Sequence, residues 1–163
     1  MRPARRSNMG ADVTPGGRIA TLLYLVVHGA CTPTGTGGAV ELSWRLRPAS
    51  SSLPDKFVDC VAPDGADRGS VKRIRLDWTV GDETGSTDWP CTNNQGVTGF
   101  DLPSGIASLT VSPECDGKDA LPATYIAPPP EQRDSVAGQT ITLGAVELVL
   151  QVNSCTIQPC ICQ

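Results

Sequence analysis

Hydrophobic and polar residues alternate along two segments of the chain. In segment 40–47 every second residue is apolar, namely Val40, Leu42, Trp44 and Leu46. Segment 73–80 repeats the pattern with Ile74, Leu76, Trp78 and Val80. Because successive side chains of a strand point to opposite faces, this period of two predicts half-buried strands. Each apolar face includes a tryptophan, so we expect Trp44 and Trp78 to anchor the core.

Further apolar runs predict shorter strands over 97–102, 107–111, 124–126, 140–143 and 146–152. Gly144 interrupts the last pair and predicts a bulge or bend, while 81–85 reads as a turn. No window has the spacing of an amphipathic helix, and 17 Gly and 14 Pro favour turns. We therefore predict an all-β fold, an antiparallel β-sandwich of about seven strands over residues 39–163. Its layout resembles immunoglobulin-like and transthyretin-like sandwiches.

The first thirty residues differ in kind from the rest. They contain four arginines and one acidic residue, followed by an apolar run over 19–27 and the small pair Gly29-Ala30. A basic segment, a short apolar run and small residues are typical of a secretory signal peptide, which we assign to residues 1–30. A buried amino-terminal strand or helix is the alternative.

Residues 26–31, Val-Val-His-Gly-Ala-Cys, resemble the lipobox of bacterial exported lipoproteins. The resemblance implies that Cys31 is acylated and anchors the protein in a membrane; Thr32 after it implies an outer-membrane or cell-surface location. His28 stands where this family has an aliphatic residue, and ordinary cleavage near Ala30 is the alternative outcome. Residues 31–38 contain no large apolar side chain and read as a flexible spacer after the anchor.

Six cysteines remain once Cys31 is set aside. They are Cys60, Cys91, Cys115, Cys155, Cys160 and Cys162. An even number in an exported domain predicts three disulfides, of which 15 pairings are possible. Cys160 and Cys162 are not expected to bond to each other, because each is expected to tie the tail to a different part of the domain. A metal or redox site is the alternative, but paired C-x-x-C spacing is missing.

The histidine content and the net charge argue against several classes of function. The single histidine, His28, lies in the predicted signal, so we expect no histidine-based catalysis, no metal site and no cofactor. Without residues 1–30 the chain keeps 9 basic and 16 acidic residues, a net charge of −7. Such an acidic surface makes nucleic acid a poor partner. We expect a protein that is not an enzyme.

The remaining candidate chemistry is ligand binding. Loop 88–96 joins one ring to several amides, and its candidate ligand residues are Trp89, Asn93, Asn94 and Gln95. Such a combination suits a sugar; a disulfide-pinned turn is the alternative. Acidic residues at 82, 83 and 88, and at 55, 59, 64 and 67, suggest calcium or simply a solvated loop.

These observations predict a non-catalytic lipoprotein of the cell envelope with a structural or adhesive role. Its expected partners are a membrane, through the lipid anchor, and a protein or glycan of the envelope or surface. A carbohydrate- or calcium-dependent binding module is one alternative. A subunit of a surface fibre is another, with 145–152 as the edge strand that pairs between copies.

Overall fold

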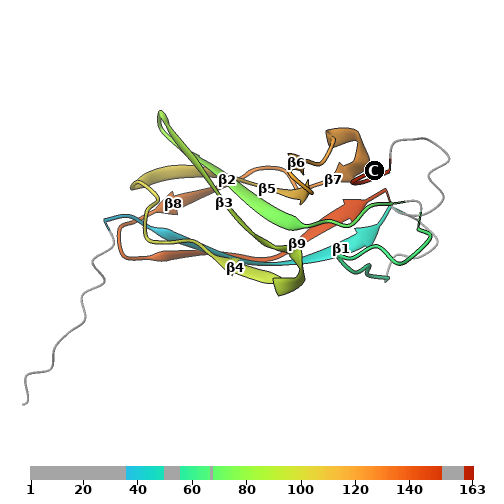
Figure 1. The fold of residues 1–163 in the computed structure, drawn as a ribbon. Helices are drawn as coiled ribbons and strands as arrows, with labels where there is room; N and C mark the ends of the chain where they lie inside the picture. The colour runs from blue at the N-terminus through green and yellow to red at the C-terminus, as the bar shows by residue number, and fades with distance from the viewer. Residues whose placement is uncertain (1–35, 50–55, 67, 152–159) are drawn as a thin grey trace, which may run out of the picture. The chain divides into compact units, whose positions relative to one another are not determined.

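Two β-sheets face each other and enclose the core (Figure 1). The computed structural model describes residues 36–49, 56–66, 68–151 and 160–163. The first sheet contains, in order, β4 (Gln95–Val97), β1 (Ala39–Pro48), β9 (Thr140–Leu150) and β7 (Tyr125–Ile126). The second contains β3 (Glu83–Pro90), β2 (Arg73–Val80), β5 (Gly105–Cys115) and β6 (Lys118–Asp119), with β8 (Glu131–Ser135) also paired to β5. Two short 3₁₀ helices are present, η1 (Cys91–Asn93) and η2 (Pro122–Thr124).

The all-β sandwich predicted from the alternating pattern is confirmed. On β1 and β2 the apolar positions point inward, and Trp44 is only 2% exposed. Leu148 and Leu150 of β9 are fully buried against them. Trp78 also packs against the core but stays partly exposed, because its ring lies over Gly85 on the neighbouring strand β3. Trp44 is therefore the larger contributor to the core.

Several segments differ from their predicted structure. Residues 81–85 form a turn only at Gly81 and Asp82, and strand β3 begins at Glu83. Strands β6 and β8 were not predicted either. In the predicted strand 97–102, only Val97 belongs to a named strand, and Leu102 makes a single bridge to Gly38. The sequences of β3 and β8 are mostly polar because both lie at a sheet edge, where burial imposes little hydrophobic alternation.

The pairing of β1 with β9 is parallel, whereas the other named strand pairs of the sandwich are antiparallel. The predicted irregularity at Gly144 is confirmed. Glu41 pairs with Thr142 but Ser43 pairs with Ala145, so β9 carries one extra residue there. Gly144 has a φ of +70°, a left-handed conformation that glycine adopts without a steric penalty.

Strand β9 is not the terminal strand of its sheet. It pairs with β1 along its length, and its last residues, Val149 and Leu150, pair with β7 on the other side. The predicted edge segment 145–152 is thus covered on both sides at 149–150, and its residue 152 lies outside the described residues. The terminal strands of this sheet are β4 and β7.

Candidate functional site

Disulfides connect the loops at one end of the sandwich. Cys60 bonds to Cys91 and Cys115 bonds to Cys162, with Cα–Cα distances of 5.8 and 5.2 Å. Cys160 is disulfide-bonded as well. The prediction that Cys160 and Cys162 do not bond to each other is confirmed. Cys31 and Cys155 lie outside the described residues.

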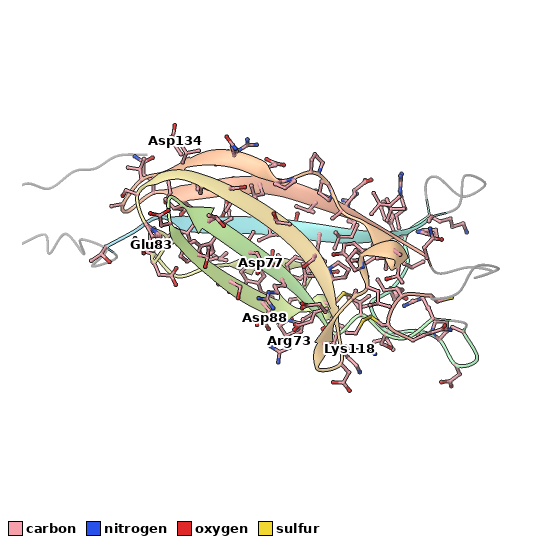
Figure 2. The ribbon with its side chains drawn as sticks, turned by 90° about the horizontal axis from the view of Figure 1, so that it is seen from above. Arg73, Asp77, Glu83, Asp88, Lys118 and Asp134 are labelled. Carbon is pink, nitrogen blue, oxygen red and sulfur yellow. A yellow bond between two sulfur atoms is a disulfide. The ribbon has the colours of Figure 1, made fainter. Side chains whose placement is uncertain are left out.

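The bonded cysteines follow strands that run toward the same end. Cys91 comes directly after β3, and Cys115 is the last residue of β5. Figure 2 shows the sulfur atoms near Arg73 and Lys118, far from Glu83 and Asp134 at the other end. That other end is where β1 begins, with Gly37 hydrogen-bonded to Phe100 and Gly138. Gly37 and Gly38, which we predicted as part of the flexible spacer 31–38, are buried here, because they pair with residues 100–102. We call the cysteine-bearing end the loop end of the sandwich.

Trp89, one of the predicted ligand residues, belongs to β3, and its ring reaches β4, a terminal strand of the other sheet. Its ring stacks on Trp44, with centroids 6.1 Å apart, and covers Gly96. The indole Nε1 donates a hydrogen bond to the Val97 carbonyl oxygen at 3.3 Å. Trp44 Nε1 in turn donates to the Cys91 carbonyl oxygen at 2.8 Å. Trp89 therefore closes the core and leaves only part of its surface for a ligand.

The four predicted ligand residues do not share one site. Trp89 and Gln95 line a surface hollow of about 520 Å³ together with Glu41, Ser43 and Thr142. Asn94 lines two other hollows, and Asn93 lines none of these three. The separation arises at η1, after which Asn94 adopts a left-handed φ of 58° and reverses the chain.

The three hollows adjoin one another. Ser43 lines both the first and a second hollow of about 560 Å³, and Phe57 and Asn94 line both the second and a third of about 740 Å³. Together they follow the outer face of β1 toward the loop end. We call this surface the β1 track. The polar or ring-bearing side chains that line it include Glu41, Ser43, Arg45, Phe57, Asn94, Gln95 and Thr142, and the lining also contains Trp44, Asp59, Arg68, Trp89 and Thr92. Sequence analysis named Trp89, Asn94 and Gln95 as candidate ligand residues and Asp59 as a calcium candidate, but it did not group the others with them, because they come from segments far apart in the chain.

The wall of the third hollow is held by a buried arginine. The Arg68 guanidinium donates to the carbonyl oxygens of Asp59 at 2.8 Å, Val61 at 3.2 Å and Gly69 at 3.2 Å. Arg68 is only 7% exposed, and burial lowers its pKa although the nearby Asp59 carboxylate raises it. The Cys60–Cys91 disulfide joins this wall to η1. The loop is thus fixed in shape before any ligand arrives.

Those of the predicted acidic residues that the structure describes do not gather as a calcium site. Glu83 and Asp88 belong to strand β3 rather than to a loop, and Asp88 forms an ion pair with Arg73, which Figure 2 shows beside it. The hydrogen bond that Arg73 donates to the Asp88 carboxylate raises the pKa of Arg73. Residues 55 and 67 lie outside the described residues. Within the described ranges, no group of three or more potential metal-ligating side chains is close enough to hold an ion.

Comparison of the chain with protein-family models, with curated proteins and with solved structures yields no match. In the part of the chain that the structure describes, no helix is long and apolar enough to cross a membrane. We therefore infer the function from the amino-acid sequence and from the side chains that line the β1 track.

Proposed function

We propose that the protein is an exported, non-catalytic binding protein of the cell envelope, attached to a membrane by lipid on Cys31. The disulfides carry this proposal. Cys60–Cys91 and Cys115–Cys162 link segments 31 and 47 residues apart, and both bonds brace loops that contain little regular structure. Disulfides of this kind persist in oxidising compartments outside the cytosol. The signal-like and lipobox-like residues 1–31 supply the matching route of export.

The position of the loop end supports a binding role. Cys31 precedes Thr36 by five residues, a distance that an extended chain spans with at most about 18 Å. A lipid on Cys31 therefore keeps the start of β1 near the membrane. The disulfide-braced loops lie at the other end of the strands from this attachment point. Loops held by a rigid scaffold are the usual position of binding residues.

Intact mass spectrometry of the protein purified from its native membrane tests the proposal. We expect a chain that begins at Cys31, carries acyl groups and has lost two hydrogens for each disulfide. The variant Cys31→Ala should lose the acyl mass and move to the soluble fraction, whereas the spacer variant Thr34→Ala should keep both. A full-length, unacylated chain with free thiols in the cytosol would refute the proposal.

A further inference from the structure

We propose that the β1 track binds an uncharged polysaccharide, with successive sugar units lying along the outer face of β1. This inference rests on the proposed binding function at the cell envelope and names the chemical class of its partner. It differs from the site expected from loop 88–96, because it is centred on β1 and Asn93 does not line it.

The track presents hydrogen-bonding groups in a row. Glu41, Ser43 and Arg45 are alternate residues of β1 and so point to its outer face. Gln95 of β4 pairs with Ser43 on one side, and Thr142 of β9 pairs with Glu41 on the other. Carboxylate, hydroxyl, amide and guanidinium groups thus follow one another in the pattern needed to hold the hydroxyl groups of a sugar chain.

These groups are oriented before binding. Thr142 Oγ1 donates to Glu41 Oε1 at 2.6 Å, and Ser43 Oγ donates to the Gly144 carbonyl oxygen at 3.2 Å. The Asn94 carbonyl oxygen accepts a bond from the Trp44 backbone N–H at 3.0 Å, which fixes this residue against β1. Side chains held in place lose less conformational entropy when a ligand binds.

The track also offers a ring at its loop end. Phe57 is 52% exposed, and the Arg45 guanidinium lies over its ring at 5.2 Å. About half of Phe57 stays exposed despite this cation–π contact. Exposed aromatic rings give sugar units an apolar surface on which their C–H faces can pack.

Charge selects the class of ligand. Glu41 and Asp59 supply two negative charges along the track, and Arg45 and Arg68 supply two positive charges, so the charges cancel. A neutral polyol can bond to groups of either sign without leaving a charge unpaired, whereas an anionic polymer meets a chain that is already acidic. A protein partner fits less well, since the centre of a protein interface is generally apolar and the middle of this track is polar.

The test is binding of the oxidised full-length protein to an array of neutral oligosaccharides, followed by calorimetry with the best probe. We expect affinity to rise with oligosaccharide length until the track is filled. Gln95→Ala and Glu41→Ala should each weaken binding by about tenfold, since each removes a side chain that hydrogen-bonds to the sugar hydroxyl groups. Gln132→Ala is the matched control, an exposed strand glutamine on the other sheet, and should leave affinity unchanged.

Three results would overturn the inference. One is the absence of binding to every neutral glycan on the array. Another is binding of anionic glycans only, with strong salt dependence. The third is a stable dimer of the wild type that Gln95→Ala converts to a monomer, which would show that the face is an interface between copies. None of these results bears on acylation of Cys31, so the envelope proposal stands or fails separately by mass spectrometry.

Discussion

The ring of Trp89 lies directly against the backbone of Gly96, with no space for a side chain between them. A Cβ atom added to Gly96 would come within 2.3 Å of the indole Cδ2 atom. Gly96 is buried and lies in β4, which has only three residues. The glycine lets Trp89 reach over the short edge strand and stack on Trp44. Trp89 can therefore cover this side of the core only because Gly96 has no side chain.

We expect Gly96→Ala to lower the free energy of unfolding by about 1–3 kcal/mol, because the methyl group forces the Trp89 ring out of its contact. Urea unfolding monitored by tryptophan fluorescence measures the loss, and the folded emission should shift to the red as Trp89 becomes more exposed. Gly99→Ala is the control, since its Cβ would meet atoms no closer than 3.6 Å. Equal stability of the two variants would contradict this role for Gly96.

The disulfide Cys115–Cys162 should contribute more to stability than Cys60–Cys91. It closes a loop of 47 rather than 31 residues and attaches the carboxyl-terminal segment to β5. Chain entropy predicts a stabilisation of about 4 kcal/mol for each, slightly larger for the longer loop. The double variants Cys115→Ser/Cys162→Ser and Cys60→Ser/Cys91→Ser, compared by urea unfolding under oxidising conditions, measure both. An unchanged midpoint in either variant would show that its bond does not brace the fold.

Arg68→Met should destabilise the protein by about 1–3 kcal/mol, because the substitution keeps the length of the side chain and leaves three carbonyl oxygens without their donor. Hydrogen exchange should rise at the amides of Ala62 and Val71, which are bonded within the same loop. Arg133→Met removes an exposed arginine that pairs with Glu131 and should change stability by less than about 0.5 kcal/mol. Similar losses in both variants would argue against a special role for Arg68.

Stability should fall in alkaline solution through Tyr125. Burial raises its pKa, and the carboxylates of Asp119 and Asp77 raise it further. The unfolded pKa of tyrosine is about 10, so the folded state holds the phenol proton more tightly. The resulting stability is fully present below pH ~10 and is lost as the pH rises through the folded pKa. Unfolding by urea on either side of this pH should show the loss in the wild type and a smaller loss in Tyr125→Phe. Identical alkaline profiles would contradict the assignment.

The strands with a buried face were predictable from local pattern alone. Strand β2 has the predicted bounds, 73–80, and β1 extends one residue beyond each end of the predicted 40–47. Strand β3 was not predicted because its neighbour Trp78 fills the space over Gly85, so this edge strand needs few apolar residues of its own. Strand β8 was not predicted because three of its five residues are charged, so it lacks the alternation of apolar and polar residues.

The candidate site was only partly predictable. Asn94 and Gln95 were recognised because an aromatic residue and amides stand together in the sequence. Glu41, Ser43 and Thr142 had no such signal, because each alternates with core residues and reads as an ordinary solvent-facing position of a strand. Their joint surface arises only when the first strand pairs with the last.

Taken alone, the sequence determined the all-β class, the inward faces of the main strands, the bulge at Gly144 and the need for disulfides, since each follows from neighbouring residues or from composition. Tertiary structure decided the parallel pairing of β1 with β9, the partners of Cys60 and Cys115, and the β1 track. These features depend on contacts between residues as far apart as Ser43 and Ala145. The physical reason is that alternation fixes which way a side chain points, whereas the identity of its neighbour depends on how the whole chain packs.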